Sequence, residues 1–223
     1  SFPKSFPTCI MNSQKEKLWN SNYCKVMIAN FTLFFSFYLL MPLLPIYLSE
    51  NFHATKDMIG LVLSGYSVTA MLFRPFSGFM IDNFQRKIVL MWVFFLFFIF
   101  FAGYIIAGSL LLFAVIRTLH GGPFGAITVA NSTVAIDVLP SSRRNEGIGY
   151  YGLGNNLGMA IAPSVGIFIY QITHDFNFIF LLSMLIAGIG LAVDATLHLP
   201  KRTIPTGNRP ISLDRFFLLN GWA

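Results

Sequence analysis

The longest stretch without a charged side chain runs from residue 88 to residue 116, and it limits the possible folds more than any other feature. Its first half contains WVFFLFFIFF, which does not alternate between apolar and polar residues as a transmembrane β-strand would. An uncharged apolar run of about 18 residues or more is typical of a membrane-spanning helix. Only 11% of the residues are charged, whereas soluble domains carry roughly 25%. The sequence therefore predicts an all-α membrane protein.

Six such spans can be placed along the chain. They cover residues 23–49, 58–81, 88–106, 109–138, 147–173 and 176–198. We expect residues 1–22 to form an N-terminal tail, residues 23–198 a transmembrane domain and residues 199–214 a polar linker. The final residues, 215–223, resemble the start of a seventh helix. Met11 is a candidate translation start, which would place residues 1–10 outside the native chain.

The basic residues predict the orientation of these spans. One side of the membrane receives the tail and the connections after the second, fourth and sixth spans. That side holds Lys4, Lys15, Lys17, Lys25, Arg86, Lys87, Arg143, Arg144, Lys201, Arg202, Arg209 and Arg215. The opposite side holds Lys56, while Arg74 and Arg117 fall inside spans. Because cytoplasmic loops are enriched in Lys and Arg, we expect both ends of the chain in the cytoplasm. The positive net charge is then explained by the orientation of the spans in the membrane, and no nucleic-acid partner is expected.

Arg117 and His120 lie near the middle of the fourth span. An arginine at mid-bilayer costs about 2.5–3.5 kcal/mol on insertion scales. It can serve a substrate or proton site, or it can hold the bundle together by bonding to neighbouring carbonyl groups. The sequence leaves both readings open. The pKa range of histidine suits His120 to proton movement, although a structural role remains the simpler reading for this residue.

The fifth span carries small residues at intervals of four: Gly154, Gly158, Ala162 and Gly166. Such a stripe allows another helix to approach closely. Pro163 follows the third of them and favours a bend, because proline lacks a backbone N–H donor. In the first span, Pro42 and Pro45 predict a kink. The third span is rich in Phe on every face, so we expect it at the lipid-facing periphery.

Four motifs together resemble the major facilitator superfamily. GFMIDNFQRK matches the family pattern G-x-x-x-D-R-x-G-R-K at Gly78, Asp82, Arg86 and Lys87, while Asn83 and Gln85 depart from it. RTLHGG matches R-x-x-Q-G at Arg117 and Gly121, with His120 in place of the glutamine. GMAIAPSVGI is similar to the fifth-span motif of proton-driven antiporters, and MPLLP is similar to the proline pair of drug-exporter-like members. The resemblance covers the chain after about residue 18.

The resemblance implies the N-terminal six-helix half of a transporter, built from two inverted three-helix repeats. It implies a substrate cavity lined by the first and fourth spans, with Asn30, Phe34, Tyr38, Arg117, His120 and Asn131 as its residues. It also implies a gate formed by Gly78, Asp82, Arg86, Lys87 and Asp137. In this gate, Asp82 accepts hydrogen bonds at a facing helix N-terminus, and Arg86 pairs with Asp137.

The function implied is proton-coupled efflux of a small, partly apolar compound by alternating access. The implied partners are that substrate, protons, the lipid bilayer of the cytoplasmic membrane and a C-terminal six-helix half. A sugar or metabolite permease is the alternative within transport. A membrane enzyme is disfavoured because the four histidines are scattered without metal-ligand spacing, and no cofactor is expected. A scaffold has little use for an arginine at mid-membrane. No acid lies at mid-bilayer, so a coupling carboxylate is expected in the other half.

Overall fold

The computed structural model describes residues 17–199, and the described chain is entirely helical. The helices are α1 (Ser21–Leu40), α2 (Leu44–Phe52), α3 (Lys56–Asn83), α4 (Arg86–Ile106), α5 (Leu110–Val138), the 3₁₀ turn η1 (Ser141–Arg143), α6 (Arg144–Thr173) and α7 (Phe176–Ala195). Six of them, all except α2 and η1, are long and apolar enough to cross a membrane. The all-α membrane fold is confirmed. Most of the predicted tail and linker, and the predicted seventh helix, lie outside the described residues.

Polar residues just before the helices fix several of the starts. Asn20, Thr55, Ser109 and Asp175 each accept a hydrogen bond from a backbone N–H in the first turn of α1, α3, α5 and α7. Such caps satisfy backbone donors that have no partner within the helix. The connection between α3 and α4 is only two residues long, so Arg86 and Lys87 lie in the first turn of α4 instead of in a loop.

The predicted single span 23–49 is wrong in one respect, because it is two helices. The chain leaves the helix at Met41–Leu43 and resumes as α2. Pro42 and Pro45 each lack a backbone N–H donor, so the hydrogen bonds along the helix are interrupted at two nearby positions. Tyr47 then holds α2 in place, with its ring 5.1–5.3 Å from the rings of Phe113 and Phe180.

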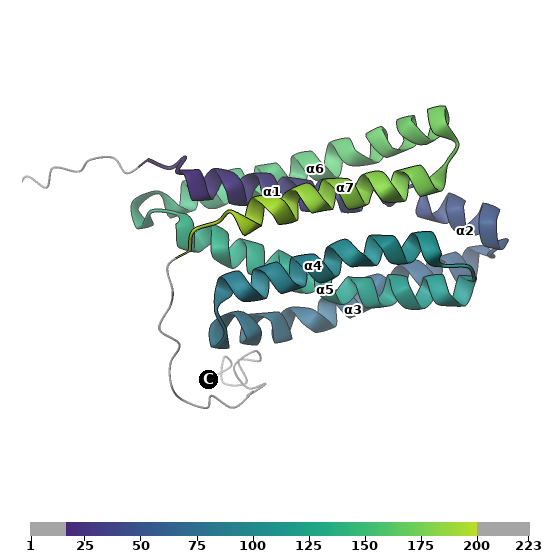
Figure 1. Cartoon of the computed structure of the whole chain (residues 1–223), viewed down its shortest axis with the longest axis horizontal. Helices are drawn as coiled ribbons and strands as arrows, with labels where there is room; N and C mark the ends of the chain where they lie inside the picture. The colour runs from purple at the N-terminus through teal and green to yellow at the C-terminus, as the bar shows by residue number, and fades with distance from the viewer. Residues whose placement is uncertain (1–16, 200–223) are drawn as a thin grey trace, which may run out of the picture.

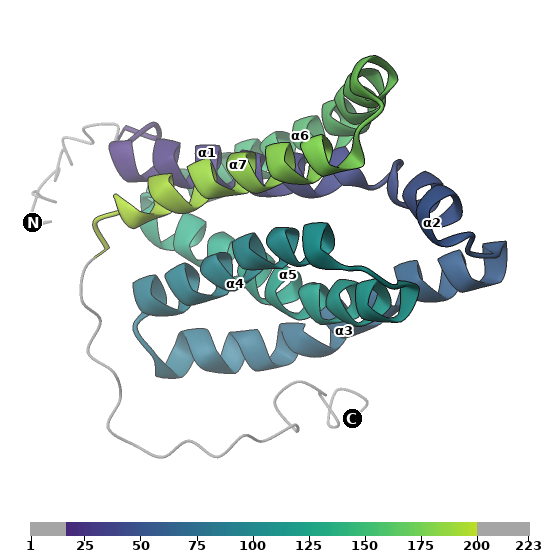
Figure 2. The same cartoon turned by 45° about the vertical axis from the view of Figure 1, so that its right-hand side comes forward.

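The spanning helices form two groups of three. In one group, α6 and α7 pack on α1; in the other, α3 and α4 pack on α5. Figures 1 and 2 show the two groups as separate layers, with α2 at the far end of the first. Contacts between α4 and α7, and fewer between α1 and α5, join the layers.

Four chain segments meet at one end of the bundle: the start of α1, the α3–α4 connection, the α5–α6 connection and the end of α7 (Figure 1). Hydrogen bonds join them, such as the one from the Asn20 amide to the Val138 carbonyl at 2.7 Å. Six of the described basic residues lie at this end, namely Lys17, Lys25, Arg86, Lys87, Arg143 and Arg144. We call this end the basic end. Lys56 begins α3 at the opposite end.

Helix α4 is apolar all round, yet it is not uniformly exposed. One face, which includes Phe94, Phe97, Phe101 and Tyr104, is completely buried against α5 and α7. The opposite face, which includes Trp92, is exposed. The helix therefore lies at the edge of the bundle, with half of its aromatic side chains in the core.

Candidate functional site

Arg117 is the largest fully buried side chain of the described chain, with 1% of its surface exposed. Its Nη1 donates to the Tyr104 hydroxyl at 3.1 Å, and its Nη2 approaches the Met41 sulfur at 3.5 Å. The guanidinium carbon lies 4.1 Å from the centre of the Tyr66 ring and 5.2 Å from that of Phe37. Cation–π contacts of this kind strengthen when desolvated. No carboxylate among the described residues pairs with Arg117.

The Tyr104 hydroxyl connects Arg117 to His120. It lies 2.6 Å from His120 Nδ1. Since a guanidinium can only donate, the hydroxyl accepts from Arg117 and has its own proton available for the imidazole. His120 is completely buried and stacks on the Phe100 ring at 5.3 Å, and its Nε2 has no hydrogen-bond partner among the described residues. The arrangement is a buried chain of three polar side chains from α4 and α5.

A second polar group joins α1 to α6. Tyr151 donates to the Asn30 side-chain oxygen at 2.8 Å, and the Asn30 amide donates to Asn155. Asn131 is also completely buried, but neither its amide nitrogen nor its oxygen has a partner in the described chain.

The six residues expected to line one cavity are therefore distributed over separate contacts. Arg117 and His120 come together through Tyr104, and Phe34 stacks on Tyr38 at 6.3 Å. Four of the six, Asn30, Arg117, His120 and Asn131, are at most 1% exposed, whereas Phe34 and Tyr38 are half-buried. Aromatic rings from α1, α3 and α4 surround Arg117.

Tyr104 and Tyr151 were not predicted as site residues from the sequence. Tyr104 is the only hydroxyl-bearing residue in the Phe-rich span 88–106, and that exception could have singled it out.

The small residues of α6 face α1. A Cβ added at Gly166 would lie 2.2 Å from the Leu39 carbonyl oxygen, and one at Gly158 would lie 3.4 Å from the Phe34 Cβ. One at Gly154 would lie 3.1 Å from the Met27 side chain. Ala162 is completely buried, and Pro163 lies within the helix, which continues past it to Thr173.

A second close helix crossing joins α3 to α5, and it was not predicted from the sequence. A Cβ at Gly121 would lie 2.2 Å from the Tyr66 carbonyl oxygen, and one at Gly125 would lie 2.2 Å from that of Ala70. The i, i+4 spacing of the two glycines is the signal that could have revealed it.

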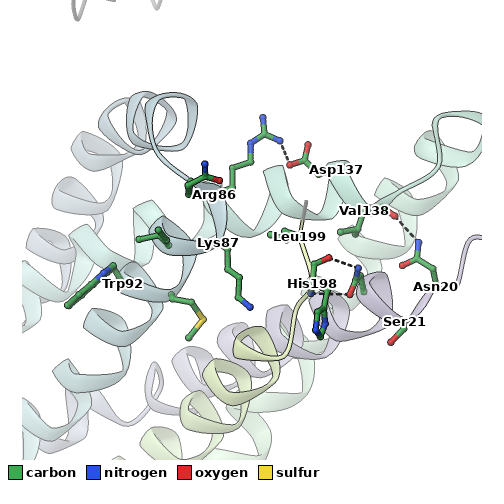
Figure 3. Close-up of a pocket in the computed structure, with 13 residues that line it drawn as sticks. Asn20, Ser21, Arg86, Lys87, Trp92, Asp137, Val138, His198 and Leu199 are labelled. Carbon is green, nitrogen blue, oxygen red and sulfur yellow. Dashed lines mark hydrogen bonds and ion pairs between the residues drawn. The ribbon is translucent and has the colours of Figure 1, made fainter. Parts of the chain in front are cut away.

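The motif GFMIDNFQRK, which was expected to form the gate, lies at the basic end. Arg86 forms an ion pair with Asp137, as Figure 3 shows, and their side chains are 19% and 36% exposed. Lys87 donates to the carbonyl oxygens of Ala195 at 3.0 Å and Leu197 at 2.7 Å. A cation favours the C-terminal end of a helix, so Lys87 caps α7.

Asp82 and Gly78 have no such contacts. Asp82 is exposed, and its side chain makes no hydrogen bond or ion pair with a described residue. A Cβ at Gly78 would meet no atom within 4 Å. Neither residue is required for packing within the described chain.

A cavity of about 1310 Å³ opens at this end (Figure 3). It lies between the start of α1, the first turns of α4, and the ends of α5 and α7. Its lining consists of Asn20, Ser21, Asn22, Gln85, Arg86, Lys87, Ile88, Met91, Trp92, Asp137, Val138, His198 and Leu199. Of the residues predicted for the site, it includes three gate residues and none from the expected substrate cavity.

Comparison with known proteins identifies the family. Residues 26–222 match the model of the Major Facilitator Superfamily. The chain belongs to this superfamily. Quinolone resistance protein NorA of Staphylococcus aureus (strain MRSA252) is 24% identical over 177 residues, which cover 79% of this chain and 45% of NorA. A galacturonate transporter of Dickeya chrysanthemi is 24% identical over 136 residues, which cover 61% of this chain and 39% of that protein.

Solved structures of the superfamily share the fold. The human organic anion transporter MFSD10 (TETRAN) superposes with a TM-score of 0.68 at 19% identity, covering 81% of this chain and 47% of MFSD10. The POT family transporter PepTSo superposes with a TM-score of 0.70 at 16% identity, covering 83% of this chain and 40% of PepTSo. The chain thus spans less than half the length of the relatives named here, and it is related to transporters.

Proposed function

We propose that this chain is the N-terminal six-helix half of a secondary transporter that exports a small, partly apolar compound in exchange for protons. The observation that carries the proposal is the similarity to a quinolone resistance protein along 79% of the chain. The buried polar chain of Arg117, Tyr104 and His120 supports it, since ionisable groups at membrane depth favour substrate or ion pathways over passive packing. The basic end then faces the cytoplasm of a multi-pass protein of the cytoplasmic membrane.

The proposed substrate path runs along α1 and α5. In the conformation described, Arg117, His120 and Asn131 are buried, so transport requires a second conformation in which they meet water or substrate. Movement of the α1–α6–α7 group relative to the α3–α4–α5 group would open that path. The contact between the groups runs mainly through α4 and α7, so these two helices would have to shift in such a movement.

The proposed gate lies at the basic end. The ion pair between Arg86 and Asp137 links α4 to α5, and an exposed pair of this kind is worth about 0–1 kcal/mol. Asp82 is exposed without a hydrogen-bond or ion-pair partner in the described chain, and a Cβ at Gly78 would meet no atom within 4 Å, so both positions could meet the proposed C-terminal half. The gate would bias two conformations that differ by a few kcal/mol.

Everted membrane vesicles that contain the complete protein test this function. An inside-acid proton gradient should drive accumulation of a radiolabelled quinolone, and a protonophore should abolish it. Vesicles without the protein are the control, and equal accumulation in both would refute the proposal.

A metabolite permease is the second candidate, because a galacturonate transporter is also a relative. Uptake of labelled galacturonate, with no gradient-driven quinolone accumulation, would favour this alternative.

A further inference from the structure

Asp194 is an acid that the proposed substrate path and gate do not use. It lies in the last turn of α7 and is completely buried. Neither carboxylate oxygen has a hydrogen-bond partner among the described residues. The two ion pairs found in the described chain involve other acids, Asp137 and Glu146. Asp194 is therefore a buried carboxyl group without a compensating partner in this part of the chain.

The site of Asp194 is formed by several helices. One turn earlier, Gly190 is wedged between α1 and α4: a Cβ there would lie 2.4 Å from Thr32 Oγ1 and 2.7 Å from the Phe94 ring. Helix α7 packs mainly on α1 and α4 and also contacts α6. The carboxyl group thus lies at the end of α7 that packs against these helices, near the basic end.

The charged and titratable groups on these helices are already engaged. Lys25 of α1 donates to the Thr196 carbonyl oxygen at 2.9 Å, and Lys87 of α4 donates to two carbonyl oxygens of the same helix end. Arg86 of α4 pairs with Asp137, and Glu146 of α6 pairs with Arg143. Cys24 of α1 is a free thiol. Among the phenols, Tyr23 of α1 donates to the Gly147 carbonyl oxygen at 2.7 Å, and Tyr151 of α6 donates to Asn30. No ammonium group forms an ion pair with Asp194.

An ionised carboxylate in such a site would have lost its water without gaining a partner, and the usual outcome is that the group takes up a proton. We propose that Asp194 is a proton-binding site of the transporter. It holds a proton while α1, α4, α6 and α7 are packed as they are here. It releases the proton to water when the basic ends of these helices separate. The inference rests on the proposed function, because it makes Asp194 one of the groups that couple proton movement to transport.

Two neutral variants of the complete protein, Asp194→Asn and Asp194→Ser, test the inference. The control is Asp175→Asn at the opposite end of α7, where the side chain is exposed and caps the helix, a role that asparagine also fills. The first measurement is the infrared difference spectrum of lipid-reconstituted protein between neutral and alkaline pH. The second is transport of a radiolabelled quinolone, measured as gradient-driven accumulation and as exchange without a gradient.

We expect the wild type and the control to show the carbonyl band of protonated carboxylic acid, which disappears at alkaline pH, and both Asp194 variants to lack the component of this band that Asp194 contributes. We also expect the Asp194 variants to lose gradient-driven accumulation while they keep exchange. The inference is overturned if either variant shows the band at its full wild-type intensity or accumulates quinolone like the wild type. If the wild type itself shows no gradient-driven accumulation, the proposed function fails, and the infrared band alone decides whether Asp194 binds a proton.

Discussion

The crossing of α3 and α5 makes the sharpest prediction, because its two backbones approach without intervening side chains. Replacing Gly121 by alanine places a Cβ 2.2 Å from the Tyr66 carbonyl oxygen and 3.1 Å from the Ala70 nitrogen. Both are backbone atoms, so no side-chain rotation can relieve the overlap. One helix must therefore move away from the other.

The size of the effect follows from the distance. Ordinary contact with a Cβ begins at 3.4 Å, so the helices must separate by about 1.2 Å at this point. Overpacking a close-packed interior costs about 1–3 kcal/mol, and the upper part of that range is expected where backbone must move. The separation would also shift the Tyr66 ring, which lies 4.1 Å from the Arg117 guanidinium. Stability and the buried arginine site should therefore change together.

The next residue in the chain supplies a matched control. A Cβ at Gly122 would approach the Phe73 ring at 3.4 Å, which is ordinary contact, and that ring is 48% exposed. The assay is the midpoint of thermal unfolding of each purified variant in detergent, read from the fraction that remains monodisperse. Gly121→Ala should unfold well below the wild type, and Gly122→Ala close to it. Equal midpoints for the two variants would refute the close-approach argument.

Four further outcomes are expected. Gly166→Ala should lower the unfolding midpoint, because its Cβ would lie 2.2 Å from a backbone oxygen of α1. Tyr151→Phe should cost about 0.5–1.5 kcal/mol in a denaturant titration, since one buried interhelical hydrogen bond is lost. Arg117→Ala should abolish quinolone accumulation in vesicles while membrane insertion remains normal. Asp82→Asn should insert with normal topology but transport poorly, with its basic end more accessible to thiol-reactive probes.

Three of these variants have a control at a position that lacks the feature in question. Gly149→Ala adds a Cβ where no atom lies within 4 Å, so a midpoint as low as that of the Gly166 variant would contradict the packing argument. Arg144→Ala removes an exposed arginine at the basic end and should leave transport intact. Asp57→Asn, at the other end of α3, should transport normally. Full transport by the Arg117 variant would show that this arginine is structural only, and unchanged transport and accessibility in the Asp82 variant would leave only a topological role for the motif.

The number and approximate limits of the spans could be predicted from the sequence, because a bilayer imposes a length and a composition on each helix. The break at Met41–Leu43 could not, since two prolines permit either a kink or a new helix. The choice depends on Tyr47, whose aromatic neighbours come from α5 and α7. Such contacts between distant segments have no signature in local composition.

The candidate site was only partly predictable for the same reason. Arg117 was evident, because an arginine in an apolar span is costly wherever its partners lie. Its partner Tyr104 was hidden in a helix that is apolar on every face, where composition does not indicate which face is buried. Asp194 lies near the end of the sixth predicted span, but its complete burial depends on how α7 packs against the other helices.

Arg117 and Asp194 pose a common problem, since each is fully buried and neither has a partner of opposite charge within the described chain. In a rigid scaffold, an apolar side chain of similar size would often be as stable or more stable at such a position. The two groups also lie at different contacts: Arg117 lies among α1, α3 and α4, and Asp194 lies at the end of α7, which packs mainly on α1 and α4. Both sites include α1 and α4, which belong to different layers. A movement of one layer against the other would change both environments at once. Substrate contact at the arginine and proton binding at the acid would then be linked without direct contact between the two residues.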